Sequence, residues 1–365
     1  MFPCKARVDV NPDVPVYRSG GQTWSSAMVV AAADFLGITH SIRETLAAGL
    51  ASSSYAEEEG FEEDPGELQE SSDAFRYRHD LLTAEETERW FDAWGVGLED
   101  LTGYLARRHW RERFAGGGAD LARDYAPGAD AINGSLWAEA VFDGAARDWV
   151  NACARRSAAW VEAGGTPPPA GELEAVRGEF FARAGLSGRT LSGWLSGLGR
   201  DEAWLDRMLA LEACALRTRD AALYAVNLER ELAGKRMSLT RITLERAAFP
   251  TAEAAREAML CVAEDCDTLA EVAGRAGAAT SLESRFLDEY PNPIGRLCIS
   301  ALPGEILGPI ERDGRCELCC IVEKTEPEVR DERVRRFLEQ KAVSSAFERL
   351  INMHIVWLIE PGVIS

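Results

Sequence analysis

Residues 302–322 read LPGEILGPIERDGRCELCCIV, a turn followed by an apolar strand. Leu302–Glu305 contains the Pro-Gly pair typical of a turn, and Cys316–Val322 is an apolar run of strand length. Farther upstream, Thr240–Leu244 alternates its side chains with the period of two that a strand requires. The sequence therefore predicts a small α+β unit over Ser238–Thr325, whose first and last segments are strands.

Helices are expected between and after these strands. One helix is predicted from Pro250 to about residue 263, and Asp267 is expected to cap a second that ends near Ala276. Arg330–Asn352 has apolar residues at helical spacing and predicts a long amphipathic helix. The apolar segment Met353–Leu358 after it is expected to form a short strand.

The N-terminal region combines a weak strand signal with helix signals. Ala6–Val10 alternates as an edge strand would, although prolines follow it closely. Trp24–Leu36 has the composition of a helix, which Gly37 ends as a C-terminal cap. Ser41–Glu44 has the spacing of a capping box and is expected to start the next helix.

An acidic run follows, from Tyr55 to Ser72, with eight acidic residues and no basic one. Repulsion between these charges favours a solvated loop. The alternative interpretation is a docking surface for a basic peptide. Helices are expected to resume over Asp73–Leu82.

The next region is predicted to be helical throughout. Thr83–Glu86 is a second capping box, and the helix that it starts ends at Gly95. Leu98–Phe114 predicts a helix, and Ser135–Ala163 predicts one or two more. Gly164–Gly171 (GGTPPPAG) is the clearest linker of the chain, stiffened by three prolines.

An internal repeat spans this linker. The pattern Trp90-Phe91…Gly95…Leu101-Thr102-Gly103-Tyr104-Leu105 recurs 90 residues later as Phe180-Phe181…Gly185…Leu191-Ser192-Gly193-Trp194-Leu195. Two copies are fewer than a repeat array needs, so they predict paired helix-turn-helix units. Aromatic residues at helical spacing are expected to belong to the core rather than to a ligand cage.

These patterns predict an α+β protein that is mainly α, with a helical part and one small α+β domain. Five segments follow from them: 1–72, an N-terminal region with a short strand, helices and the acidic loop; 73–164, a helical arm; 165–235, the second repeat unit; 236–327, the α+β domain; and 328–365, the C-terminal helix and short strand.

The amino-acid composition limits the partners and the cellular compartment that we expect for this chain. With 40 Lys and Arg against 60 Asp and Glu, the net charge of −20 argues against nucleic acid and anionic membranes as partners. No apolar stretch is long enough to span a bilayer, and the start of the chain lacks the apolar core of a signal peptide. Nine scattered cysteines are typical of reduced thiols. We therefore expect a cytoplasmic protein.

We expect no catalytic residue, no cofactor and no metal site from motifs. Walker, GxGxxG, GxSxG and HExxH patterns are missing, and the four histidines have no arranged partner nearby. The best zinc candidate is the pair Cys316 and Cys319, with Cys261 and Cys266 as further thiolates. On a strand, however, Cys316 and Cys319 would point to opposite faces, so we expect a buried strand there.

The segment 238–325 resembles a parvulin-type peptidyl-prolyl isomerase domain. Leu302–Ile310 is similar to the family's Pro-Gly-Glu-Ile-Ser-Gly-Pro-Val segment before its last strand, and Asp267–Ala273 is similar to its acidic Ala-Glu-Leu-Ala helix. The helices over Leu82–Phe114 and Arg330–Asn352 resemble the arms of SurA-like chaperones. The resemblance implies a helical chaperone-like part joined to a small parvulin-like domain.

The chain departs from this family at the residues that matter for catalysis. The resemblance places Ile242 and Glu317 where the family has two histidines, and Ala278–Phe286 stands in place of its glycine-rich loop. Without the histidine pair the domain is expected to be degenerate and non-catalytic. The candidate peptide-binding patch is then Ile242, Phe286, Glu317 and Cys319, with the helical arms around Trp90, Trp94 and Tyr104 as the alternative.

Peptide binding is the function that survives these losses. By analogy with degenerate parvulin-like proteins beside maturation systems for ribosomally made peptide natural products (RiPPs), we expect the chain to present a precursor peptide to tailoring enzymes. One alternative is a weak prolyl isomerase that uses Glu317 or Cys319 as its polar group. Another is a structural subunit that docks an enzyme. The sequence does not decide whether the chain forms a homodimer.

Overall fold

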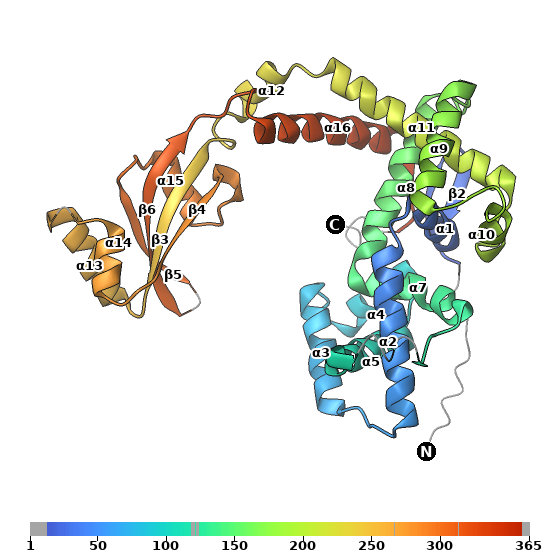
Figure 1. The fold of residues 1–365 in the computed structure, drawn as a ribbon, viewed down its shortest axis with the longest axis horizontal. Coiled ribbons are helices and arrows are strands. Elements are labelled where there is room, and N and C mark those ends of the chain that lie inside the picture. Colours follow the sequence, from blue (N-terminus) through green and yellow to red (C-terminus); the bar gives the residue numbers. More distant parts are fainter. Residues whose placement is uncertain (1–12, 118–120, 122–123, 266, 313, 360–365) are drawn as a thin grey trace. The chain divides into compact units, whose positions relative to one another are not determined.

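The computed structural model describes residues 13–117, 121, 124–265, 267–312 and 314–359. The strand expected over Ala6–Val10 lies outside them. The chain forms two compact units, one from residues 1–221 and 345–365 and one from residues 222–344. The segments 73–164 and 165–235 thus lie largely in the first unit, and 236–327 lies in the second (Figure 1).

The first unit is mainly helical. Its helices are α1 (Ser26–Leu36), α2 (His40–Glu58), α3 (Pro65–Arg78), α4 (Ala84–Trp94), α5 (Leu98–Arg113), η1 (Ala115–Gly117), α7 (Ala129–Asp143), α8 (Ala145–Glu162), α9 (Ala170–Ala184), α10 (Leu191–Gly197) and most of α11 (Glu202–Ala225). A small antiparallel sheet has the order β2 (Gln22–Ser25), β1 (Pro15–Ser19), β7 (Ile355–Trp357). The short strand predicted near the C-terminal end is confirmed as β7.

The helix-turn-helix repeat is confirmed in both copies. Gly95 after α4 and Gly185 after α9 have φ values of 64° and 62°, the left-handed conformation that glycine adopts most easily. The next residue donates from its N–H to Phe91 O in one copy and to Phe181 O in the other, as in a Schellman cap. The second copy is shorter, because α10 has 7 residues and α5 has 16.

The acidic run proves to be mostly helical, so the predicted loop is wrong. α2 continues through Glu58 and α3 begins at Pro65. Asp64 caps α3 by accepting a hydrogen bond of 2.8 Å from Gly66 N, and Pro65 suits the first helical position. Most of the acidic side chains are exposed, so water and salt screen their repulsion.

Two local helix signals were also misread. The box predicted at Ser41–Glu44 is absent: α2 begins at His40 with Thr39 as its N-cap residue. The Thr39 hydroxyl and the Arg43 guanidinium both donate to Asp34 instead. The helix expected from Trp24 begins only at Ser26, since Trp24 lies in β2. The box at Thr83 and the caps at Gly37 and Gly95 are confirmed.

The second unit, residues 222–344, is larger than the α+β domain predicted over 236–327, because it also takes in residues on both sides of that segment. Its elements are α12 (Leu228–Lys235), β3 (Arg241–Phe249), α13 (Ala252–Asp265), α14 (Leu269–Arg275), β4 (Thr280–Phe286), η2 (Leu287–Glu289), α15 (Ile294–Ser300), β5 (Ile306–Arg312), β6 (Arg315–Thr325) and the first part of α16 (Glu332–His354). The antiparallel sheet has the order β4-β3-β6-β5. The fold class, α+β and mainly α, is confirmed.

Alternating side chains divide this sheet into two faces. On the face that we call the α15 face, a buried cluster joins strand residues to η2 and α15: Ile242, Leu244, Leu287, Tyr290, Ile294, Cys298, Ala301, Leu307, Ile310, Cys319 and Ile321. On the other, the α13 face, Phe249, Cys316 and Leu318 pack with α13 and α14. Cys316 and Cys319 thus point to opposite faces, as predicted.

One further expectation for this unit needs correction. The N-cap of α14 is Thr268, not Asp267, because Thr268 forms a capping box with Glu271. Asp267 instead pairs with Arg275. Ala278–Phe286, for which the sequence predicted no element, contains strand β4, which pairs with β3 along its length.

Candidate functional site

The structure brings three of the four predicted patch residues to one face and separates the fourth. Ile242 and Cys319 belong to the cluster of the α15 face, and Glu317 lies two residues before Cys319 on the same side of β6. Phe286 is buried in a different cluster, with Leu232, Leu239, Val334 and Leu338. Ile242 is only 1% exposed and Cys319 is 0% exposed, so neither forms an accessible surface.

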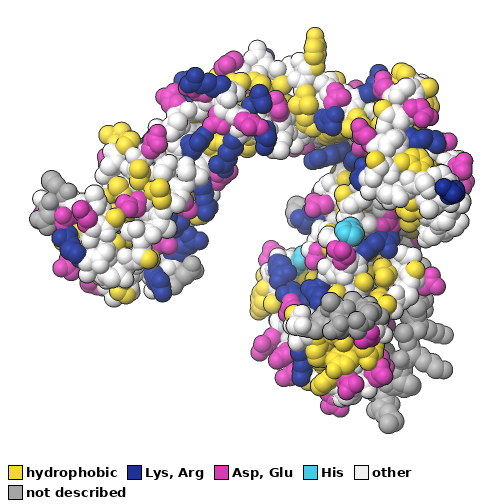
Figure 2. All heavy atoms as spheres, in the orientation of Figure 1, with side chains coloured by type: hydrophobic (Ala, Val, Ile, Leu, Met, Phe, Trp, Pro, Cys, Tyr) yellow, Lys and Arg dark blue, Asp and Glu magenta, His cyan; other side chains and the backbone are white. Residues whose placement is uncertain are grey.

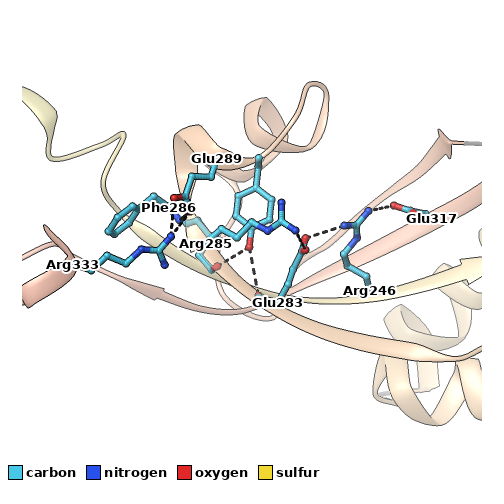
Figure 3. A network of polar contacts seen from close by, with 9 residues as sticks. Arg246, Glu283, Arg285, Phe286, Glu289, Glu317 and Arg333 are labelled. Carbon is cyan, nitrogen blue, oxygen red and sulfur yellow. Dashed lines mark hydrogen bonds and ion pairs between the residues drawn. The ribbon is translucent and has the colours of Figure 1, made fainter. Parts of the chain in front are cut away.

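A polar network of Arg246, Glu283, Arg285 and Glu317 lies on the α15 face (Figure 3). Arg246 is the cross-strand partner of Cys319. Arg246 Nη1 lies 2.9 Å from Glu283 Oε1, and the other guanidinium nitrogen binds Glu317. Arg285 Nη2 lies 3.1 Å from Glu283 Oε2. Glu317 is therefore a partner of Arg246 rather than a free carboxylate.

Charge balance holds this network in place. Burial alone would disfavour the guanidinium cation, but the hydrogen bond and charge of Glu317, with the charge of Glu283, raise the pKa of Arg246 above its ordinary value. The three side chains expose only 15%, 18% and 18% of their surface. The charged groups of Arg246, Glu283 and Glu317 are therefore paired with one another on the α15 face.

The titratable groups nearest this network stay protonated at neutral pH. Burial raises the pKa of the Cys319 thiol to about 11, although the charge of Arg246 opposes this shift. Burial also raises the pKa of Tyr290 to about 12, and its hydroxyl donates to Ile242 O at 2.8 Å. A thiol with such a pKa is a poor nucleophile, since the thiolate is the reactive form.

No metal site is visible in the part of the chain that the structure describes. Among those residues, no three His, Cys, Asp or Glu side chains lie close enough together to hold a metal ion. Cys266, the fourth thiol of the zinc candidate, lies outside that part.

Strand β4 forms one edge of the sheet, and sequence reasoning missed it. It pairs with β3 on one side, and among the described residues no strand pairs with its other side. The opposite edge, β5, contains Pro309 and an irregular register between Leu307 and Ile310, two devices that protect an edge. β4 has neither glycine nor proline.

The register shows which backbone groups of β4 point outward. Leu287 N donates to Thr240 O at 2.9 Å, so this neighbouring pair is hydrogen-bonded. Antiparallel pairs alternate between bonded and non-bonded, which places Leu282 and Ser284 in non-bonded pairs. Their N–H and C=O groups therefore point away from β3. The Leu282 side chain is 68% exposed beside them.

The helical alternative is less accessible than its aromatic content suggested. Trp90, Trp94 and Tyr104 are buried, with 7%, 3% and 7% of their surfaces exposed, so the predicted core role of the stripe is confirmed. The first unit does contain clefts. One of about 470 Å³ lies between α3 and α5, and another of about 670 Å³ is lined by Trp160, Pro167 and residues of α9 and α11.

Comparison with known proteins gives only weak likenesses in fold. No family model matches the chain, and no curated protein matches it. The foldase protein PrsA of Streptococcus pneumoniae aligns over 63% of this chain and 91% of its own, with 13% identity and a TM-score of 0.26. PrsA of Bacillus subtilis aligns over 60% and 86%, with 11% identity and a TM-score of 0.20. Function is therefore inferred from the residues of this chain.

Among the described residues, the surface shows no separation of charged and hydrophobic side chains on the face seen in Figure 2, where acidic and basic side chains are interspersed with hydrophobic ones. None of the helices in the described ranges is long and apolar enough to cross a membrane.

Proposed function

We propose that this chain is a non-catalytic peptide-binding protein of the chaperone type, in which the edge strand β4 holds an extended peptide by strand addition. The observation that carries this proposal is the outward backbone of Leu282 and Ser284 on an edge without proline, glycine or a pairing strand among the described residues. Strand addition uses main-chain hydrogen bonds for affinity and alternate side chains for specificity. This site replaces the patch predicted from the sequence.

The α15 face supports a non-catalytic role. At the two positions that the resemblance assigns to histidines, Ile242 is buried and Glu317 is bound by Arg246. The Cys319 thiol is buried and protonated. Ile242 and Cys319 are not available to a proline peptide without opening of the buried cluster, and Glu317 is held by Arg246.

The peptide that fits this role is a precursor peptide, presented in extended form to tailoring enzymes. The parvulin-like and SurA-like resemblance supports this proposal by analogy, and the β4 edge supplies the means of holding a peptide. Reduced thiols fit a cytoplasmic setting, where such precursors are made.

A proline placed in β4 tests the binding mode. Ser284→Pro removes an outward N–H but no bond to β3, so the sheet is expected to persist. Ser284→Ala keeps the N–H and serves as the matched control, because both variants lose the hydroxyl that contacts Thr243. With a permanently unfolded model protein or the candidate precursor as ligand, we expect Ser284→Pro to lose about tenfold in affinity while Ser284→Ala binds normally.

The ligand is titrated by calorimetry, and circular dichroism verifies the fold of each variant. Equal affinity in the wild type and both variants would place the peptide elsewhere, first in the cleft beside Trp160. Absence of any binding to the wild type would contradict peptide binding itself.

A further inference from the structure

The α13 face beside β4 carries carboxylates that no described cation neutralises. Leu282, Glu245, Cys320 and Ile306 form one cross-strand row over all four strands. Glu245 is half-buried in this row, and among the described residues no Lys, Arg or His pairs with it. Its charge also helps to raise the pKa of Cys320, after burial, which agrees with their neighbouring positions.

The neighbouring cross-strand row on the same face also contains a carboxylate without a described cation, and this one is exposed. Ser284, Thr243 and Glu323 are cross-strand partners on β4, β3 and β6. Glu323 is exposed, and its Oε1 accepts only a hydrogen bond from Thr325 among the described contacts. The two strand carboxylates on the α15 face differ, because Arg246 binds both Glu283 and Glu317.

A long cationic side chain could reach these carboxylates from an added strand. Neighbouring strands lie about 4.8 Å apart, so a peptide strand on β4 would run about 10 Å from β3. Ser284 and Thr243 lie between the β4 edge and these carboxylates, and their hydroxyl oxygens are 3.1 Å apart. Both side chains are short, so they do not block a ligand side chain that crosses this part of the sheet. Lys and Arg have flexible apolar stems that cross such a distance.

We propose that β4 selects a basic peptide, with an apolar residue opposite Leu282 and a Lys or Arg two residues away, opposite Ser284, whose cation lies between Glu245 and Glu323. This inference rests on the proposed function, since it assigns the side chains of the strand that β4 binds. The spacing of two follows from strand alternation, which places residues i and i+2 on one face. A cation between these two carboxylates would be attracted by both charges.

Two synthetic peptides test the selection with the full chain. The first has the sequence Thr-Val-Thr-Leu-Thr-Arg-Thr-Val-Thr, and the second carries citrulline, the neutral isostere, in place of Arg. We expect the Arg peptide to bind about fivefold more tightly in low salt, with the ratio falling as salt rises. In the double variant Glu245→Gln/Glu323→Gln the ratio should fall to near one.

A matched variant controls for net charge alone. Glu257→Gln/Glu264→Gln on α13 removes two exposed carboxylates of the same unit, as many as the test variant removes, and should leave the ratio unchanged. If both peptides bind the wild type equally, or Glu245→Gln/Glu323→Gln keeps the ratio, the charge selection is wrong although strand addition stands. If neither peptide binds at any salt concentration, strand addition to β4 fails, and the selection fails with it.

Discussion

Replacing Arg246 by methionine would test whether the polar network holds the second unit together. Arg246 is the cation that joins Glu283 to Glu317. Arg246→Met leaves Arg285 beside Glu283, but it leaves Glu317 without a described cation. Methionine keeps most of the apolar stem, so the change isolates the charge.

The expected cost follows from burial. Removing one partner of a buried ion pair typically costs about 3–5 kcal/mol, because the other charge stays buried alone. The side chains here expose 15–18% of their surface and Arg285 remains at 3.1 Å, so we expect a loss of about 2–3 kcal/mol. Adding Glu317→Gln removes the orphaned charge, and the double variant should recover about half of the loss.

Hydrogen exchange is the appropriate assay, since the ten tryptophans all lie in residues 1–221 and 345–365. Tryptophan fluorescence therefore reports on the first unit alone. We would follow the protected amides of β3 and β6 by mass spectrometry in the wild type, the single variant and the double variant. Unchanged protection in Arg246→Met, or a double variant less stable than the single one, would refute the electrostatic account.

Three other outcomes are expected. The pure protein should show no prolyl isomerase activity above background in a protease-coupled assay; ordinary parvulin efficiency, abolished by Glu317→Gln, would contradict the proposed function. Since burial raises the pKa of Cys319 to about 11, iodoacetamide should leave this thiol unlabelled in the native protein at pH 7–9 and label it after unfolding; fast native labelling would show an open α15 face. Gly95→Ala should destabilise the first unit by roughly 2 kcal/mol and Gly185→Ala by roughly 1, because both have positive φ but only the first added methyl meets Val14. Denaturation followed by tryptophan fluorescence measures both, and equal losses would show that Val14 moves aside freely.

The fold was predictable wherever a local pattern determined it. The capping box at Thr83 and the glycine ends at Gly95 and Gly185 depend on residues within one turn, and each is confirmed. Thr39 and Asp267 show the limit of such patterns. The Thr39 hydroxyl donates to Asp34 of the preceding helix, a contact that the local pattern does not contain. The capping box of Thr268 and Glu271 is visible in the sequence, but the prediction assigned the cap to the neighbouring Asp267 in its place.

The site was less predictable because a sheet face depends on register. The resemblance placed Phe286 in one patch with Ile242, yet β4 pairs Ile242 with Arg285 and so turns Phe286 to the other face. β4 itself, TSLESRF, has mostly polar, exposed residues and lacks the apolar alternation that marks a strand.

The pairing of β7 with β1 also sets an order of events during synthesis. β1 lies near the start of the described chain and β7 near its end, and residues 222–344 are translated between them. Every strand of the four-stranded sheet thus leaves the ribosome before β7 does, and domains generally fold as units during translation. The nascent chain can complete its four-stranded sheet while the first unit still lacks its third strand. The first unit can therefore complete its three-stranded sheet only after β7 has been translated.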